Sequence, residues 1–223
     1  MLGAGDRGYS APMRLVCLSD THNLAESVTV PDGDVLLHAG DLTQRGTREE
    51  VERAARWLGT LPHRHKVVVA GNHDFFFQKE PQRARALLEG VPGIVYLADE
   101  EATVDGLRIY GTPWQPWFYD WAFNLPRDGD ELARIWAAVP AGVDVLLSHS
   151  PAHGILDRTA GGDAVGCERL RLELPRIRPR LHVFGHIHEA YGDVTIDATR
   201  HVNASTCDLR YRAVQAPVVI DLA

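Results

Sequence analysis

Short apolar runs recur along the chain, and each one ends in a cluster of polar residues. Runs of this length that are bounded by turn residues are typical of buried β-strands. A stretch with helical spacing lies between the second and third runs, so strands and helices alternate, as they do in α/β proteins. The runs that carry this prediction are residues 14–18, 35–39, 67–70, 143–147 and 181–184.

The segments between these runs supply helices and further strands. Thr47 and Glu50 form a capping box that predicts a helix over 47–58, which Gly59 should end. Periodicity predicts other helices over 130–139, over 82–88 and through Leu170 and Leu174, the last disturbed by Pro175. The Asp105-Gly106 turn predicts an antiparallel hairpin of 102–104 with 107–110. Additional strands are expected at 94–97 and, closing a second sheet, at 194–196 and 218–220.

Composition sets the organisation of the chain. With 223 residues, 45% hydrophobic and 24% charged, it is long enough for one domain with a sizeable core. Residues 1–12 show neither a signal pattern nor helical periodicity, so we expect a disordered lead and a single domain over 13–223, with Met13 a plausible natural start.

Charge and cysteine content narrow the class of function. A formal net charge of −7 argues against general affinity for long nucleic acid, although a bound metal can reverse the local sign for a small phosphate ligand. The three dispersed cysteines fit a reducing cytosol, and no apolar run approaches the length of a membrane span. We therefore expect a soluble cytoplasmic protein; the sequence does not set its oligomeric state.

The polar residues that follow the strands are the candidate chemistry. Because strand ends of an open α/β sheet converge on one crevice, these side chains should meet there, and divalent metals satisfy such a set. It divides into two sites, one of Asp20, His22 and His188 and one of Asn72, His149 and His186, with Asp41 as the bridge and a turn at Gly185 that lets the last two histidines diverge. Mixed nitrogen and oxygen ligands suit Mn²⁺ first, with Fe²⁺ or Zn²⁺ as alternatives.

At this point the chain resembles the calcineurin-like metallophosphoesterases. Their ordered blocks Asp-x-His, Gly-Asp, Gly-Asn-His-Asp, a strand-end His and Gly-His-x-His all occur between Asp20 and His188. The resemblance implies a four-layer αββα sandwich of two mixed sheets flanked by helices, and the same ligand assignment.

A narrower resemblance is to the metallophosphoesterase-domain-containing (MPPED) proteins. It rests on blocks such as 109–118, 123–126 and 203–207 and implies a phosphodiesterase for cyclic nucleotides (2′,3′ or 3′,5′) and aryl diesters. Animal members carry Gly-Gly-Ile-His where this chain has Gly185-His186-Ile187-His188, so here the second site should be complete.

A mechanism follows from two metals about 3.5–4 Å apart, which hold a bridging hydroxide for in-line attack on phosphate. With Asp20 and Asp41 the centre carries roughly one positive charge, a match for a monoanionic diester. His73 is the predicted general acid, and Asp74 is a second catalytic candidate that either orients it or, as neighbouring residues often do, faces away from it. The alternatives are a phosphomonoesterase, a Mn²⁺-dependent nuclease for short single strands, and a non-catalytic metal-binding interaction module.

The segment 112–126 is rich in tryptophan and proline without periodicity, so we expect a structured loop. It either covers the core as a lid or offers a platform on which a planar substrate group stacks. The predicted substrate contacts are Trp114, Trp117, Tyr119 and, four residues beyond His149, His153.

Overall fold

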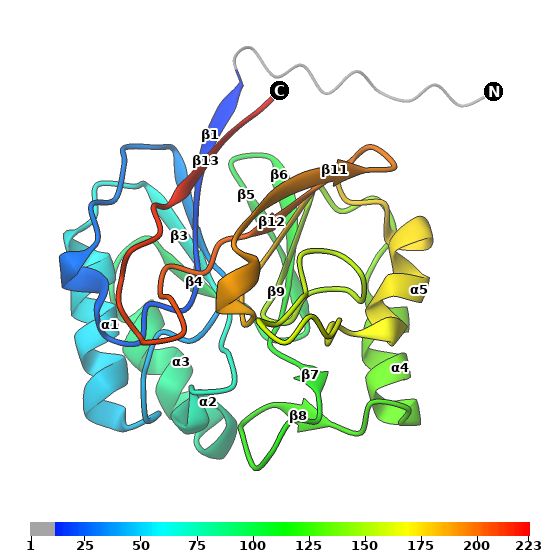
Figure 1. The fold of residues 1–223 in the computed structure, drawn as a ribbon. Helices are drawn as coiled ribbons and strands as arrows, with labels where there is room; N and C mark the ends of the chain where they lie inside the picture. Colours follow the sequence, from blue (N-terminus) through cyan, green and yellow to red (C-terminus); the bar gives the residue numbers. More distant parts are fainter. Residues whose placement is uncertain (1–11) are drawn as a thin grey trace.

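A computed structural model of the protein describes residues 12–223, and it contains two β-sheets packed face to face with helices outside them (Figure 1). The predicted lead falls outside the described residues except for Pro12, which is exposed coil. The first sheet has the order β13 (Val218–Leu222), β1 (Met13–Leu18), β2 (Val35–His38), β3 (His65–Val68) and β4 (Ile94–Tyr96). The second has the order β11 (Gly192–Ile196), β12 (Thr199–Asn203), β10 (Leu181–Phe184), β9 (Val145–Ser148), β6 (Leu107–Thr112) and β5 (Glu100–Val104).

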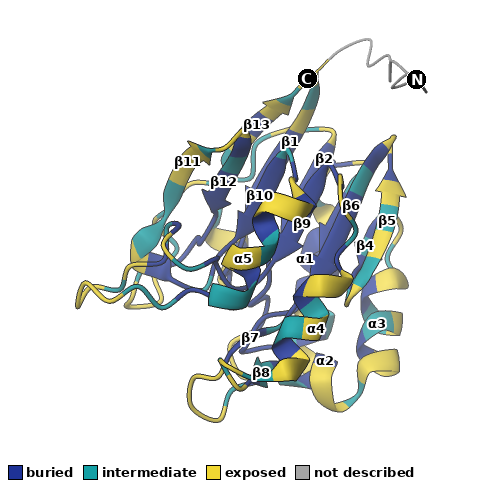
Figure 2. Ribbon diagram, turned by 90° about the vertical axis from the view of Figure 1, so that its right-hand side faces the viewer, coloured by how far each residue is buried: buried dark blue, intermediate teal, exposed yellow. Residues whose placement is uncertain are grey.

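Within the described part of the chain, five α-helices cover the outer faces of this pair of sheets. On the first sheet lie α1 (Arg48–Thr60), α2 (Phe75–Lys79) and α3 (Pro81–Glu89); on the second lie α4 (Asp130–Ala138) and α5 (Glu168–Ile177). Shorter elements are β7 (Gln115–Pro116), β8 (Asn124–Leu125) and two 3₁₀ turns, η1 (Ala25–Ser27) and η2 (His188–Ala190). In Figure 2 the helices show exposed residues on their outer sides, while the central strands β2, β9 and β10 are buried along their whole length.

Three hydrophobic cores separate four layers of secondary structure: helices, sheet, sheet and helices. Successive side chains of a strand point to opposite faces, so β1 sends Val16 and Leu18 into the core under α1–α3 and sends Leu15 and Cys17 between the sheets. The third core, around Trp136 and Phe184, lies under α4 and α5. The predicted αββα sandwich is confirmed.

Local sequence signals account for most of the element boundaries. The capping box at the start of α1 is present, with Thr47 Oγ1 accepting from the Glu50 amide and the Glu50 carboxylate accepting from the Thr47 amide. Asp105 and Gly106, at φ 46° and 88°, turn β5 into β6 as predicted.

Four boundaries differ from the prediction. Gly59 does not end α1, which continues to Thr60, and residues 75–79, for which no element was predicted, form the short helix α2. Pro175 lies inside α5 without ending it, because Leu174 and Ile177 on either side are both buried in the third core. The strand at 218–222 pairs antiparallel with β1, so it extends the first sheet and not the second.

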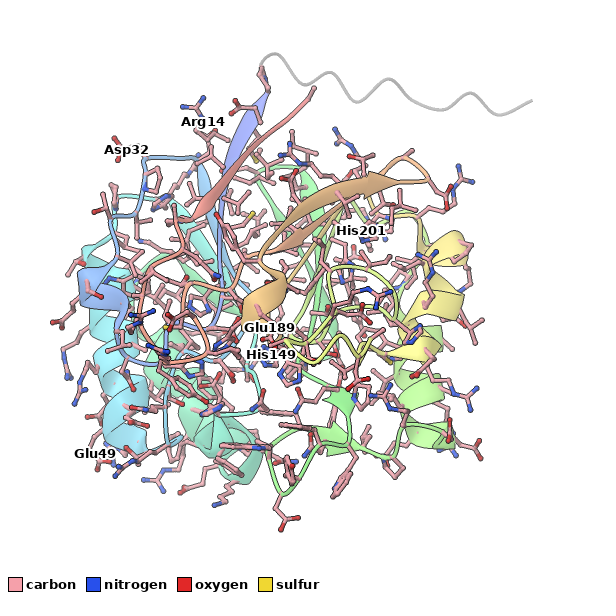
Figure 3. The ribbon with its side chains drawn as sticks, viewed as in Figure 1. Arg14, Asp32, Glu49, His149, Glu189 and His201 are labelled. Carbon is pink, nitrogen blue, oxygen red and sulfur yellow. The ribbon has the colours of Figure 1, made fainter. Side chains whose placement is uncertain are left out.

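The topology places the predicted site residues together. β1, β2 and β3 are parallel neighbours in one sheet, and β9 and β10 are parallel neighbours in the other, so their carboxyl ends meet at one edge of the sandwich. Figure 3 shows His149 and Glu189 at that edge, far from Arg14 and Asp32 at the opposite one. Within residues 12–223 none of the helices has the length and apolarity needed to cross a bilayer.

Candidate metal centre

The first predicted ligand group, Asp20, His22 and His188, is assembled from the ends of β1 and β10. His188 Nε2 lies 3.3 Å from Asp20 Oδ1 and 3.3 Å from His22 Nε2. All three side chains are buried. Two imidazole nitrogens and a carboxylate oxygen at this separation form a cluster able to hold one divalent ion.

The second predicted group, Asn72, His149 and His186, meets around one amide oxygen. Asn72 Oδ1 lies 2.9 Å from His149 Nε2 and 2.8 Å from His186 Nδ1. His186 and His188 therefore face different groups although only Ile187 separates them. The predicted divergence is confirmed, and it is produced at His186 itself, whose φ is +68°.

Asp41 joins the two groups. Its Oδ2 lies 3.8 Å from His22 Nε2 in the first group and 3.5 Å from His149 Nε2 in the second. Its other oxygen, Oδ1, accepts the backbone amide of His73 at 2.7 Å. That second contact fixes the carboxylate so that one oxygen faces both groups.

The opposite nitrogens of three ligand histidines are held by backbone carbonyls. His22 Nδ1 contacts Thr43 O at 3.2 Å, His149 Nδ1 contacts Ala39 O at 2.9 Å, and His188 Nδ1 contacts Asp208 O at 3.1 Å. A carbonyl accepts only from N–H, so in each ring Nδ1 carries the proton and the Nε2 lone pair faces the centre. This is the arrangement typical of metal-bound histidine.

Burial gives two of the ligand histidines the neutral form that a metal requires, and it leaves Asp41 in need of a compensating cation. Burial lowers the pKa of both His22 and His186 to about 3, so their imidazoles are neutral at neutral pH. Burial and the charges of Asp20 and Asp74 raise the pKa of Asp41 well above its usual range. A buried carboxylate crowded by two others needs a cation, and the donor set therefore fits a divalent metal centre.

The backbone at the centre is strained, and two glycines have no room for a side chain. Three of the ligands that follow β1 and β2, Asp20, His22 and Asp41, have φ of +54°, +43° and +55°, a region that costs energy for residues other than glycine. A Cβ on Gly71 would lie 2.3 Å from Asp41 Oδ1, and one on Gly185 would lie 2.0 Å from Asp20 Oδ2. These glycines let the ligand loops approach each other closely.

His73 lies beside both groups with its ring held from behind. Its Nδ1 is 2.7 Å from the carbonyl of Gln44, so Nδ1–H donates there, and a ring nitrogen of His73 lies within 4.8 Å of ligand atoms of His22 and Asp41. The side chain of Trp121 stacks on the imidazole, with ring centres 4.3 Å apart. His73 is thus at the place where the predicted general acid belongs.

Asp74 does not orient His73, so the first of its two predicted alternatives is corrected. Its carboxylate is buried and accepts from the amide of Gly71 at 2.8 Å, the amide of Thr43 at 2.9 Å and the Thr43 hydroxyl at 2.6 Å. The side chain points away from the imidazole because consecutive residues face apart here. Asp74 joins the loops after β2 and β3, and the Gln44 carbonyl holds His73.

The centre opens into a cavity of about 310 Å³, which contains some of the predicted substrate contacts and not others. Trp117 lines it and is 59% exposed. Trp114 lines a separate pocket, packs on Phe123 and donates from Nε1 to Asp99 at 2.7 Å. Tyr119, packed on Phe118, and His153 are not among the lining residues. Of these four residues the structure brings only Trp117 to the cavity.

Three further residues at the centre were not singled out from the sequence. Trp121 and Tyr211 line the cavity and contact His73. Ser205 donates from Oγ to Asp20 Oδ2 at 2.8 Å. Ser205 lies in the 203–207 block that carries part of the resemblance, which was the available signal for it. Tyr211 follows no pattern in the sequence.

A fold of two packed mixed sheets with a cluster of histidine, aspartate and asparagine at their common edge defines a metal-dependent phosphoesterase class. The family described as "Calcineurin-like phosphoesterase" matches residues 13–190. Metallophosphoesterase domain-containing protein 1 of Homo sapiens is 45% identical over 237 residues, which cover 96% of this chain and 72% of that protein. The chain belongs to the calcineurin-like phosphoesterase family, and the predicted family resemblance is confirmed.

Other relatives extend the comparison. UPF0046 protein T07D4.2 of Caenorhabditis elegans is 38% identical over 94% of this chain and 60% of its own length. A protein of Synechococcus named "Probable cyclic nucleotide phosphodiesterase syc0937_d" is 28% identical over 71% of this chain and 59% of its own length. Among solved structures, TT1561 of Thermus thermophilus superposes with a TM-score of 0.60 over 86% of this chain and 88% of its own, at 13% identity, a likeness of fold.

Proposed function

We propose that this protein is a two-metal phosphodiesterase that hydrolyses small phosphodiesters, with cyclic nucleotides and aryl phosphodiesters as the substrate class and Mn²⁺ as the metal. The observation that carries the proposal is Asp41 Oδ2, which faces His22 Nε2 at 3.8 Å and His149 Nε2 at 3.5 Å. A single carboxylate oxygen directed at two ligand groups is suited to bridging two ions. When bound, such ions polarise phosphoryl oxygens and activate water.

His73 supplies the proton in this proposal. Its Nδ1–H is committed to the Gln44 carbonyl at 2.7 Å, which fixes the ring and leaves the other nitrogen near the centre. When protonated, that nitrogen donates to the oxygen of the departing alcohol, a contribution of about 10²–10⁴-fold in rate. Trp121 covers one face of the ring and limits its rotation.

The charges around the cavity favour a diester over a monoester. Arg127 is the single arginine or lysine among the described residues that line the cavity. Its guanidinium is already bound to Glu168 at 2.6 Å and to the carbonyls of Val165 and Gly166 at 2.8 Å each. A second substrate charge would therefore meet no unpaired cationic side chain, whereas a monoanion needs none.

The size and lining of the cavity favour a small substrate with a planar group. A volume of about 310 Å³ lies at the lower end of ligand pockets. Trp117 and Phe118 are exposed at its rim and offer aromatic faces to a base or aryl ring. The name of the Synechococcus relative, a probable cyclic nucleotide phosphodiesterase, supports the same substrate class.

The test is a substrate panel with the protein stripped by chelator and reloaded with Mn²⁺. The panel pairs bis(4-nitrophenyl) phosphate with 4-nitrophenyl phosphate and adds 2′,3′- and 3′,5′-cyclic nucleotides and a short single-stranded DNA. We expect a higher kcat/KM for diesters than for the matched monoester. A preference for the monoester or for DNA would replace the proposal with one of those activities, and no turnover on any substrate would favour the non-catalytic module.

We also place the protein in the cytosol. Cys17, Cys167 and Cys207 are all free and buried, as expected of chains kept in a reducing compartment. Fractionation of cells that produce the protein tests this placement, and recovery with membranes or in the medium would contradict it.

A further inference from the structure

Tyr211 lies over the metal centre although it is distant from every ligand in the sequence except His188. Its ring centre is 4.9 Å from that of His22, 5.7 Å from that of His188 and 5.9 Å from that of His73. The side chain lines the cavity and remains 39% exposed. The ring therefore lies against both the first ligand group and the predicted general acid, whose own ring centres at His22 and His73 are 4.6 Å apart, and it faces the cavity.

The hydroxyl of Tyr211 is free to act on a bound molecule. Within residues 12–223 it makes no hydrogen bond to the protein. Tyr191, in contrast, uses its hydroxyl to donate to the carbonyl of Ala216 at 2.8 Å. The Tyr211 hydroxyl is thus open to solvent and to a molecule bound in the cavity.

A turn built around Asp208 holds Tyr211 in this position. The Asp208 carboxylate accepts from the amides of Arg210 at 2.9 Å and Arg212 at 3.0 Å, and the Tyr211 amide donates to the Asp208 carbonyl at 2.9 Å. The same carbonyl contacts His188 Nδ1. One turn thus orients a metal ligand and presents the tyrosine.

The backbone is strained at this position. Tyr211 has φ of +53°, a region that is an outlier for a bulky side chain. Strained positions of this kind cluster at functional sites. Among its described lining residues the cavity also lacks an unpaired arginine or lysine. A phosphoryl oxygen bound there would therefore need a neutral hydrogen-bond donor, and the Tyr211 hydroxyl is one.

We propose that Tyr211 contacts the substrate and that its hydroxyl donates a hydrogen bond to a phosphoryl oxygen of the bound diester. The inference rests on the proposed phosphodiesterase function and deepens it. A hydrogen bond to a charged acceptor of this kind is worth about a tenfold change or more in binding. The alternative is that Tyr211 contributes only through its ring, which covers His22 and His188, and that its hydroxyl makes no contact with the substrate.

The experiment compares Tyr211→Phe, which removes only the hydroxyl, with Tyr211→Leu, which also removes the ring. Tyr191→Phe is the matched control, because it deletes a tyrosine hydroxyl outside the cavity. For each Mn²⁺-loaded protein three quantities are measured: bound metal, the kcat and KM for bis(4-nitrophenyl) phosphate, and the Kd for inorganic phosphate by calorimetry.

We expect Tyr211→Phe to keep the wild-type metal content, to lose about tenfold or more in kcat/KM, and to bind phosphate correspondingly more weakly. Tyr191→Phe should match the wild type in all three measurements. Wild-type turnover and phosphate binding in Tyr211→Phe, with a loss in Tyr211→Leu alone, would overturn the inference in favour of the cover. If the wild type hydrolyses no diester, the proposed function fails, and the phosphate affinities still decide the role of Tyr211.

Discussion

In the proposed mechanism, departure of the leaving group depends on His73. It lies beside both ligand groups without being needed to complete either, and the Gln44 carbonyl and Trp121 hold its ring. His73→Ala should leave the metal content unchanged and slow a diester with an alkyl leaving group by about 10²–10⁴-fold. A nitrophenyl diester should lose far less, because its leaving group hardly needs a proton.

The measurement is the ratio of kcat values for the two diesters in wild type and variant. His153→Ala is a matched control, since His153 does not line the cavity and should keep the wild-type ratio. Equal losses on both diesters would show that His73 is not the acid.

A substitution at Asp41 tests whether its carboxylate bridges the two ligand groups. Asp41→Asn keeps the shape of the side chain and removes the charge that faces His22 and His149. Because one carboxylate serves both groups, occupancy of both should fall together and turnover should be lost. Elemental analysis after dialysis checks this, and two retained equivalents of metal would refute the shared role.

At the scale of elements, the aromatic loop between β6 and α4 contacts two different parts of the molecule. Trp117 lines the cavity beside the ligand groups, while Trp114 packs against Phe123 and donates to Asp99 in another pocket. The short β7–β8 pairing between them and the bond from the Ala122 amide to the Asn72 carbonyl fix the loop to the centre. One segment thus packs against the core through Trp114 and lines the cavity through Trp117; stacking of a substrate on Trp117 stays a prediction.

Alanine substitutions separate the contributions of the two tryptophans. Trp117→Ala should raise KM for ring-bearing diesters by roughly 5- to 100-fold, the equivalent of about 1–3 kcal/mol of stacking, with little change in stability. Trp114→Ala should instead lower the urea midpoint and leave KM near the wild-type value. Steady-state kinetics and urea unfolding of both variants measure these effects. A stability loss in Trp117→Ala together with a raised KM in Trp114→Ala would contradict the assignment of the two tryptophans.

The sequence predicted the strands and the ligands that follow them, because both signals are local. An apolar run that stops at Gly71 and continues as Asn72-His73 specifies a buried strand and a polar end without knowledge of the rest of the chain. Trp114 and Trp117, three residues apart in a loop without periodicity, carry no local signal of which faces the cavity. The position of Tyr211 depends on contacts with residues as distant in the chain as His22, so no spacing rule could reveal it.

Pro175 and Asp74 show two other reasons for departures. Pro175 is a helix breaker by its chemistry, yet burial of Leu174 and Ile177 in the third core outweighs the lost hydrogen bond. Asp74 follows His73 directly, and the direction of its side chain depends on amides of a loop 31 residues earlier. Tertiary packing decides in both cases.

At the scale of the whole molecule, buried neutral histidines make stability depend on pH. Burial lowers the pKa of His38 to about 4 and that of His182 well below its usual value. The unfolded chain binds these protons near pH 6.5 and the folded chain does not. Stability is therefore at its full value above about pH 6.5 and falls from there toward pH 4, by up to about 1.4 kcal/mol per pH unit for each histidine.

Urea unfolding of the metal-free protein at pH 7.5 and pH 5 measures this dependence. The free energy of unfolding should be lower at pH 5, and His38→Gln, which does not titrate, should lose less between the two values than the wild type does. An equal loss in both proteins would show that His38 does not contribute.

A manganese titration of the metal-free protein tests the central claim, a centre of two ions that share Asp41. Bound Mn²⁺ per chain and the rate of bis(4-nitrophenyl) phosphate hydrolysis are followed on the same samples. The ligand geometry predicts saturation at two equivalents, with the rate rising as the second equivalent binds. Full rate at one equivalent, or two bound ions without diester hydrolysis, would contradict the account.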